Sequence, residues 1–471
     1  MERKNIWESC SKKQLSEIES FAQEYRAFLD QGKTERECIK TTLERLDAAG
    51  YRDLDKLIGK KGTLKTGDKV YRVWMNKTVI AFNLGSAPLE AGLNILGAHI
   101  DSPRLDIKQN PLYEEDGLAY LDTHYYGGVK KYQWVAIPLA LHGVVVKKDG
   151  SVVEINIGEA ADDPVFFVSD LLPHLAAEQM EKKANKVIEG EALDIIVGNR
   201  PLVLDKGSAK KDDGDPAKNA IKNNILDILK NSHGIAEEDF ISAELEVVPA
   251  GCAREAGLDR SMVLAYGQDD RVCAYTGLAA LLACKKPKRT ACLILADKEE
   301  IGSVGATGMH SRFVENTLAE LLNLAGSYSE LTLRRALAAS AMLSIDVGAA
   351  YDPFYKSSFE KRNAAMLGGG VLLEKYGGHR GKSGSNDANA EYLAYLRHIF
   401  EAAGIRFQTA EHGKVDVGGG GTIAYILAAY GMDVVDCGVP LLNMHAPWEA
   451  ASKADIYEAK RAYAAFLAGV K

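Results

Sequence analysis

An apolar run ends in polar residues in the segment Leu93-Asn-Ile-Leu-Gly-Ala-His-Ile-Asp101, and this pattern sets the fold class of the chain. The run has the length and composition of a buried strand, and His99 and Asp101 stand where that strand would end. Further strand-like runs lie at 69–74, 78–82, 290–296, 341–345 and 433–438. From 260 onward these runs alternate with Ala/Leu-rich helical segments, which predicts an α/β fold with a helix-covered, mostly parallel sheet.

The spacing and composition of the apolar runs predict a discontinuous domain and an insertion. Glu, Lys, Leu and Ala at helical spacing predict helices over 12–48. From 104 to 255, short apolar runs are separated by Gly, Asp and Lys, which predicts an inserted β-rich domain. Residues 1–103 and 256–471 would then form the α/β domain. Inside the insertion, the charged segment 205–218 is predicted as an exposed loop.

Composition excludes several classes of protein. The 471 residues carry 57 Lys+Arg against 65 Asp+Glu, and a formal charge of -8 offers no basic surface for nucleic acid. The amino terminus lacks the apolar stretch of a signal peptide, and no apolar run reaches the length of a membrane span. We therefore expect a cytoplasmic protein with neither a nucleic-acid nor a membrane partner. Seven scattered cysteines are predicted as buried thiols.

Acids and histidines gather just after the predicted strands. His99 and Asp101 follow 93–98, Glu299 and Glu300 follow 290–296, and the carboxyl ends of such strands line the ligand crevice of an α/β sheet. Each motif alone has a structural alternative. His99 can be a hydrogen-bonded core histidine, and the two glutamates can be a solvated turn. In the functional interpretation one glutamate binds a metal ion and its neighbour is a general base.

Two further candidates have similar alternatives. Gly267-Gln-Asp-Asp-Arg271 carries an acidic pair that can bridge two cations or form a surface turn with a local ion pair. His445 by itself can be a core histidine. Taken jointly, two histidines and three carboxylates suit a pair of divalent ions such as Zn²⁺, Co²⁺ or Mn²⁺. The set comprises His99, Asp269, Glu300, Asp346 and His445.

Other motifs indicate structure or disfavour other chemistries. Gly418–Thr422 lacks the Lys-Ser/Thr of a phosphate-binding loop and is predicted as a tight turn near the site. The glycine-rich segment 377–386 is either a substrate loop or a solvated connection. A terminal helix is predicted with Ser452 and Asp455 capping its first turn. Without a Gly-x-Ser-x-Gly motif or a cysteine beside a matching histidine motif, a serine or cysteine hydrolase is disfavoured.

Three motifs in order, Gly97-Ala-His-Ile-Asp-Ser-Pro-Arg-Leu-Asp106, Asp297-Lys-Glu-Glu-Ile-Gly-Ser303 and Asn443-Met-His-Ala446, resemble the aspartyl aminopeptidase family. The resemblance is to the bacterial branch of these dinuclear zinc aminopeptidases. It covers nearly the whole chain, including Ser169–Leu175 in the insertion and the glycine-rich turn at Thr422.

The resemblance implies a role for each candidate residue. The ligands would be His99, Asp269, Glu300, Asp346 and His445, with Glu299 as general base and Asp101 as the carboxylate that supports the metal site. Residues 1–103 and 256–471 would be a zinc-exopeptidase-like catalytic domain. The insertion, 104–255, would be an oligomerisation or lid domain that packs between subunits of a tetrahedral dodecamer. His174 would reach a neighbouring subunit's active site and contact substrate.

The chain also departs from the family pattern. Gln268-Asp-Asp270 stands where many relatives carry Leu-Asp-Asn, and Val-Gly-Ala-Ala-Tyr-Asp after Asp346 replaces a histidine-bearing segment. These changes leave the ligand set intact but leave open how strictly the first side chain is selected. The expected activity is removal of an N-terminal Asp or Glu from peptides. The alternatives are a metal-dependent deacylase of blocked amino acids and a catalytically silent self-assembling protein.

Overall fold

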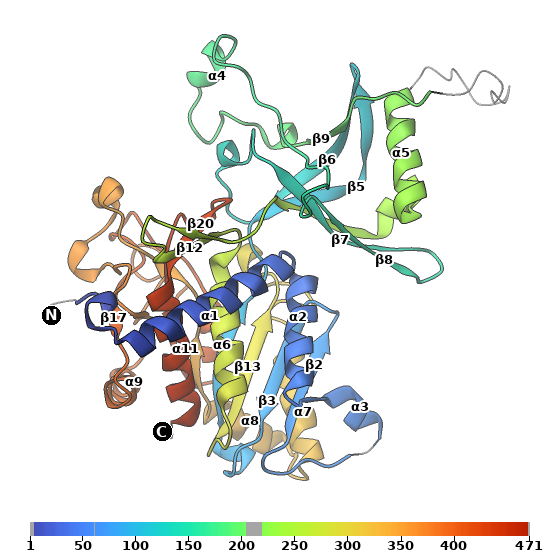
Figure 1. Cartoon of the computed structure of the whole chain (residues 1–471). Helices are drawn as coiled ribbons and strands as arrows, with labels where there is room; N and C mark the ends of the chain where they lie inside the picture. Colours follow the sequence, from blue (N-terminus) through green and yellow to red (C-terminus); the bar gives the residue numbers. More distant parts are fainter. Residues whose placement is uncertain (1–3, 61, 204–218, 470–471) are drawn as a thin grey trace. The chain divides into compact units, whose positions relative to one another are not determined.

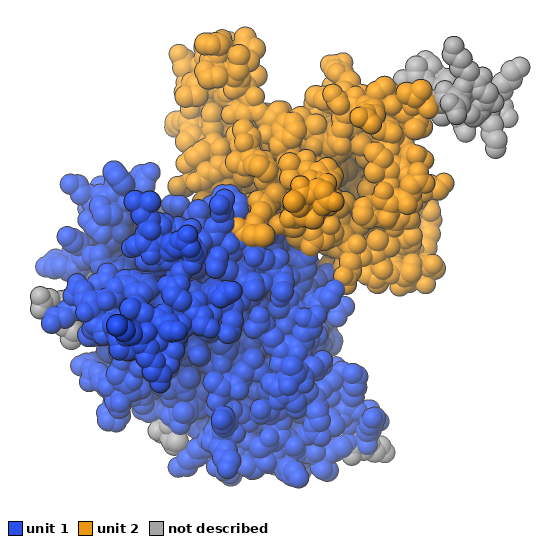
Figure 2. Space-filling view, viewed as in Figure 1, with its two compact units in different colours: residues 1–102, 253–444, 448–471 blue, residues 103–252, 445–447 orange. Residues whose placement is uncertain are grey.

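A computed structural model describes residues 4–60, 62–203 and 219–469 of the chain. The chain divides into two compact units, coloured separately in Figure 2. Unit 1 comprises residues 1–102, 253–444 and 448–471, and unit 2 comprises residues 103–252 and 445–447. The segment 205–218, predicted as an exposed loop, lies outside the described residues.

Unit 1 is built on a nine-stranded sheet in the order β1-β2-β3-β13-β4-β14-β18-β16-β17. Its four central strands run parallel: β13 (Thr290–Ala296), β4 (Leu93–His99), β14 (Ala341–Ser344) and β18 (Asp433–Gly438). The antiparallel strands β3 (Thr78–Asn83) and β16 (Val371–Glu374) flank them. The outer strands are β1 (Arg52–Asp53), β2 (Lys69–Trp74) and β17 (Phe407–Thr409). The predicted α/β class is confirmed.

Helices cover both faces of this sheet, which explains why the central strands are apolar on both sides. Alternate residues of one strand enter different cores: Leu96 and Ala98 of β4 join one cluster, and Ile95 joins the other. The first cluster includes α1 (Lys12–Gln31), α2 (Glu35–Ala48), α6 (Gln268–Ala283), α9 (Ala390–Ala402) and α11 (Lys453–Ala468). The second includes α3 (Leu54–Gly59), α7 (Phe313–Leu324), α8 (Glu330–Ala338) and α10 (Ala424–Ala428). Figure 1 shows α6 and α11 side by side over one face, with α1 crossing in front of them.

A second sheet of unit 1 brings distant segments together beside the central strands. Its order is β11 (Arg254–Ala256), β12 (Met262–Ala265), β20 (Glu449–Ser452), β19 (Pro440–Leu442) and β15 (Gly348–Ala349). It leads directly into α6 on one side and α11 on the other. The predicted cap of α11 by Asp455 is wrong, because its carboxylate accepts the backbone N–H groups of Gly368 and Gly370, each at 2.7 Å. Ser452 is the N-cap residue, but among the described residues its side chain makes no capping hydrogen bond.

Unit 2 contains a six-stranded antiparallel sheet in the order β8-β7-β10-β5-β6-β9. The strands are β5 (Arg104–Glu115), β6 (Leu118–Tyr126), β7 (Leu139–Val146), β8 (Val152–Ile157), β9 (Ile195–Gly198) and β10 (Ala243–Pro249). Its helices are α4 (Ala177–Met180) and α5 (Ala220–His233), and α5 contacts β5, β6 and β9. That residues 104–255 form an oligomerisation or lid domain stays a prediction.

Short 3₁₀ helices complete the described elements: Ile6–Ser9, Leu89–Ala91, Lys131–Gln133, Gly190–Ala192, Glu237–Ser242, Glu299–Ile301, Pro353–Ser358 and Lys361–Asn363. No helix within residues 4–60, 62–203 and 219–469 has the length and apolar character needed to span a bilayer. The cysteines are free thiols. The predicted burial holds for four of them and is wrong for Cys252, which is exposed; the buried four are Cys38, Cys273, Cys292 and Cys437.

Candidate metal centre

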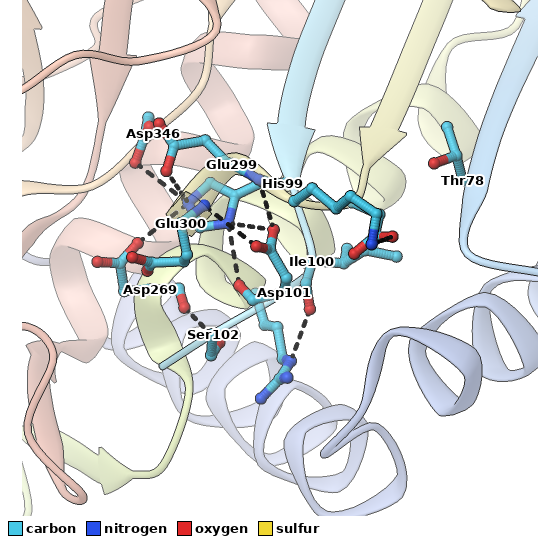
Figure 3. Close-up of polar contacts among 12 residues, drawn as sticks. Thr78, His99, Ile100, Asp101, Ser102, Asp269, Glu299, Glu300 and Asp346 are labelled. Carbon is cyan, nitrogen blue, oxygen red and sulfur yellow. Dashed lines mark hydrogen bonds and ion pairs between the residues drawn. The ribbon is translucent and has the colours of Figure 1, made fainter. Parts of the chain in front are cut away.

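His99 ends strand β4 and is the centre of a buried polar cluster in unit 1. Its Nε2 atom lies 3.2 Å from Asp269 Oδ1, 3.8 Å from Asp346 Oδ1 and 3.9 Å from Glu299 Oε2. These acids come from the start of α6, the end of β14 and the end of β13. Figure 3 shows their side chains pointing toward the His99 ring. Four chain segments that are far apart in sequence thus deliver ligand-type atoms to one point at the carboxyl edge of the sheet.

The other ring nitrogen of His99 is held by Asp101. His99 Nδ1 lies 3.0 Å from the Asp101 carbonyl oxygen and 3.3 Å from Asp101 Oδ1. A proton on Nδ1 satisfies these acceptors and leaves the lone pair on Nε2, where the other carboxylates gather. This is the arrangement in which a metal-ligating histidine is oriented by a carboxylate or carbonyl behind it.

Asp101 also orients the two adjacent glutamates. Its Oδ1 accepts the Glu299 N–H and its Oδ2 accepts the Glu300 N–H, both at 3.1 Å. These glutamates open a one-turn 3₁₀ helix, Glu299–Ile301, and Lys298 enters it with a φ of 68°. Asp101 is fully buried, so its two oxygens fix the backbone from which both glutamate side chains extend.

Asp269 is held through its backbone on both sides. Its N–H donates to Glu449 Oε2 at 3.1 Å, and its carbonyl accepts the Ser102 hydroxyl at 2.6 Å. The peptide bond that follows it, to Asp270, is cis. Residues 268–271 are all buried, so the alternative of a surface turn with a local ion pair is wrong for this segment.

Two sets of side chains in unit 1 place one ligand atom each within 4.8 Å of one another. One set is His99, Asp269 and Asp346; the other is His99, Glu299 and Glu300. Imidazole nitrogen and carboxylate oxygen are donors that Zn²⁺ accepts. The geometry therefore brings together five of the residues predicted from the sequence, counting the predicted general base Glu299.

The electrostatics of the cluster fit a bound cation. Burial disfavours a charged His99, but hydrogen bonds to Asp101 and Asp269, together with nearby carboxylate charges, outweigh this effect and raise the pKa of His99 well above its ordinary value. Burial, followed by the charge of Asp270, raises the pKa of Asp346 well above its usual range. Carboxylates around His99 and Asp346 contribute to both shifts, so negative charge is in excess at this buried site. Positive charge is favoured here, and a divalent ion would supply it.

The two remaining predicted residues belong to unit 2. His445 is half-buried, and its Nδ1 lies 3.0 Å from the Gly128 carbonyl oxygen. His174 lies in an exposed segment between β8 and β9. The ligand role of His445 and the substrate contact of His174 stay predictions.

The glycine-rich turn near the site is held by backbone and side-chain contacts. Gly378 N–H donates to Gly420 O at 2.7 Å, and the Thr422 hydroxyl donates to Asp436 Oδ1 at 2.7 Å. An added Cβ on Gly419, where φ is 136°, would overlap the Gly378 carbonyl. The predicted structural role of Gly418–Thr422 is therefore consistent with a close approach of two backbone segments.

Sequence reasoning missed the residues that hold Asp269 in place. Ser102 directly follows Asp101, and Glu449 opens strand β20 four residues after His445. An acid or hydroxyl within a few residues of a candidate ligand is the available signal for each. Glu449 itself is 1% exposed. A buried acid at the start of a strand requires a partner, and here that partner is the Asp269 amide.

Comparisons with known proteins agree with one another. A family model described as "Aminopeptidase I zinc metalloprotease (M18)" matches residues 28–467. The "Probable M18 family aminopeptidase 1" of Clostridium acetobutylicum is 58% identical, over 99% of this chain and 98% of its own length. A crystal structure of an M18 aminopeptidase from Thermotoga maritima is 46% identical with a TM-score of 0.92, and one of aminopeptidase I from Clostridium acetobutylicum is 55% identical with a TM-score of 0.90. Each structure match covers 99% of both chains.

Proposed function

This chain belongs to the M18 family of zinc aminopeptidases, so it is a metal-dependent aminopeptidase, and we propose that it removes an N-terminal Asp or Glu from peptides with two metal ions. The observation that carries the proposal is the convergence of three acids on His99 Nε2, at 3.2 to 3.9 Å, in a buried site. The acidic preference rests on the resemblance to aspartyl aminopeptidases.

Each ion is assigned a set of ligands. His99, Asp269 and Asp346 would hold one ion, and their ligand atoms already lie within 4.8 Å of one another. Asp269, Glu300 and His445 would hold the second, with Asp269 bridging. The contact of His445 Nδ1 with Gly128 supports this role, because it leaves the Nε2 atom as the ligand. Zn²⁺ is the proposed ion, with Co²⁺ or Mn²⁺ as substitutes. When bound, the ions lower the pKa of water and polarise the scissile carbonyl.

Glu299 is the proposed general base. Its carboxylate lies at the edge of the ligand cluster, 3.9 Å from His99 Nε2, and its side chain keeps 16% of its surface exposed. It would take a proton from the attacking water and pass it to the leaving amine. Asp101 would serve this step by fixing the Glu299 amide, so that the carboxylate points at the water and not into solvent.

The remaining parts of the proposal concern the assembly. By resemblance, the insertion 104–255 would pack between subunits of a tetrahedral dodecamer in the cytoplasm, and His174 of a neighbouring copy would contact substrate. The exposure of the segment around His174 supports this role, since such a segment is available to another copy. Analytical ultracentrifugation gives the mass of the assembly. A His174→Ala variant that still assembles should show a raised KM or lowered kcat; unchanged kinetics would remove His174 from the site.

A substrate panel tests the activity. Asp-, Glu-, Leu- and Lys-aminoacyl chromogens and N-acetyl-Asp are given to protein stripped of metal and then reloaded with zinc, cobalt or manganese. The proposal expects metal-dependent release from the free substrates, fastest for Asp and Glu. Faster release from Leu or Lys would reject the acidic preference. Cleavage of the acetylated substrate in place of the free ones would indicate a deacylase with the same metal centre.

A further inference from the structure

The first turn of α6, beside the ligand Asp269, buries two long polar side chains. Gln268 and Arg271 are both completely inaccessible to solvent. Burying an amide or a guanidinium group costs several kcal/mol unless its hydrogen-bonding atoms find partners. The hydrogen-bond partners of these two side chains therefore show which backbone segments the turn stabilises.

Arg271 holds the backbone between His99 and Asp101. Its Nε donates to the Ile100 carbonyl at 3.3 Å, and its Nη2 donates to the Lys33 carbonyl at 2.9 Å. Ile100 separates His99 from Asp101, so a shift of its carbonyl moves both side chains. Arg271 thus links the end of β4 to the segment that enters α2.

The two residues before Gln268 pack against this guanidinium group. A Cβ added to Gly267, where φ is 69°, would overlap Arg271 Nη1. The guanidinium carbon also lies 5.3 Å from the centre of the Tyr266 ring, at a distance typical of a cation–π contact. The Arg271 side chain therefore contacts both Gly267 and the Tyr266 ring, and a larger residue at 267 would displace it.

Gln268 acts on Asp269 through Glu449. Its Nε2 donates to the carbonyls of Glu449 at 2.6 Å and Val263 at 3.1 Å, and its Oε1 accepts the Tyr25 hydroxyl at 3.2 Å. Glu449 in turn accepts the Asp269 N–H through Oε2. The Gln268 amide thus fixes the residue that fixes the Asp269 backbone.

We infer that Gln268 and Arg271 are positioning residues that keep Asp269 and the His99–Asp101 segment at the separation that metal binding requires, without contacting the ions. This inference rests on the proposed metal centre. Loss of such outer partners typically costs about 10- to 100-fold in metal affinity or activity. We expect a loss of this size when either side chain is made apolar.

Arg289 offers a matched control. Its side chain contacts the backbone at the start of β4, whereas His99 ends that strand. Arg289 is also buried, and it donates to the carbonyls of Ala91, Gly92 and Ala339, next to the first residue of β4. Arg289→Met removes the same kind of carbonyl contacts as Arg271→Met. It should lower thermal stability without changing metal affinity, because β4 separates it from His99 by its full length.

The experiment measures the zinc dissociation constant of metal-free protein against a chromogenic chelator, together with thermal stability and kcat at saturating zinc. Arg271→Met and Gln268→Leu should weaken zinc binding about 10- to 100-fold. Arg289→Met should bind zinc as the unmodified protein does. Arg271→Lys keeps a cationic donor and should recover part of the affinity, which keeps the test decisive if Arg271→Met does not fold.

Two results would overturn the inference. One is an unchanged zinc dissociation constant in folded Arg271→Met, or in both Arg271→Lys and Gln268→Leu. The other is an equal loss of affinity in Arg289→Met, which would indicate a general effect of destabilisation. A His99→Ala variant separates this failure from failure of the proposed function: if it binds zinc as tightly as the unmodified protein, the metal centre itself is wrongly assigned.

Discussion

Replacing Asp101 by Asn tests the residue on which both glutamates depend. Each Asp101 oxygen accepts one backbone N–H, from Glu299 or Glu300, at 3.1 Å, and the residue is fully buried. Asparagine has the same shape but only one acceptor oxygen. Its amide nitrogen would face one of the two N–H groups, so two donors would oppose each other in a buried site.

The size of the effect follows from these contacts. A hydrogen bond to a charged group contributes about 1.5–3 kcal/mol, and a buried donor left without an acceptor costs about 1–3 kcal/mol. The turn Glu299–Ile301 can relieve this cost by rotating, which displaces both carboxylates. We therefore expect metal affinity or kcat to fall about 10- to 100-fold, the range for outer partners of metal ligands. That range corresponds to about 1.4–2.8 kcal/mol.

Asp455→Asn is the matched control. Asp455 is also fully buried in unit 1, and its two oxygens accept the N–H groups of Gly368 and Gly370, each at 2.7 Å. Both variants should lose thermal stability, as measured by differential scanning calorimetry. Only Asp101→Asn should lose zinc affinity, measured by chelator competition, or kcat at saturating zinc. Asp101→Asn with unchanged zinc affinity and kcat, or an equal loss in both variants, would refute the reasoning.

Three further predictions test other parts of the site and the sheet. Glu299→Gln should keep its metal content and lose about a hundredfold to ten-thousandfold in kcat, the usual contribution of a general base; full activity would reject the assignment. Burial, with two nearby carboxylates, raises the pKa of Glu374 to about 8. The folded state therefore holds a proton that the unfolded chain releases above about pH 4.5, so stability should fall by up to about 1.4 kcal/mol per pH unit between pH 4.5 and 8. Glu374→Gln should flatten this slope in melting temperatures measured from pH 6 to 8, and an unchanged slope would contradict the assignment. An added Cβ on Gly438 would overlap the Asp346 carbonyl, whereas Gly59 has open space around it. Gly438→Ala should therefore lose zinc affinity in chelator competition and Gly59→Ala should not. Equal affinities would contradict this prediction, because they would show that the Asp346 backbone moves without loss of zinc binding.

The central strands could be predicted from the sequence almost residue for residue. Strands buried on both faces must be apolar throughout, so 290–296 and 433–438 stand out from the surrounding helices. The ligands could be predicted for a related reason. An acid or histidine that directly follows a buried strand lies at the carboxyl edge of the sheet. His99 and Asp346 illustrate this rule.

The contacts that hold the ligands could not be predicted in the same way. Glu449 accepts the amide of Asp269, which is 180 residues away in the sequence, and no local pattern predicts that contact. The sequence Asp-Asp-Arg suits a surface turn as well as a buried one, and only the packing of α6 against β4 and α11 decides between them. The sequence predicts that Asp455 caps its own helix, but its oxygens accept the amides of two distant glycines.

Zinc titration of metal-free protein, with hydrolysis of an Asp-aminoacyl chromogen followed at each addition, tests the metal centre most directly. If two ions per chain act with Glu299, activity should rise until two equivalents of zinc are bound. Glu299→Gln should bind the same two equivalents and remain inactive. Hydrolysis without added metal would contradict the assignment of this cluster as the active site. Hydrolysis by Glu299→Gln at the rate of the unmodified protein would contradict it as well.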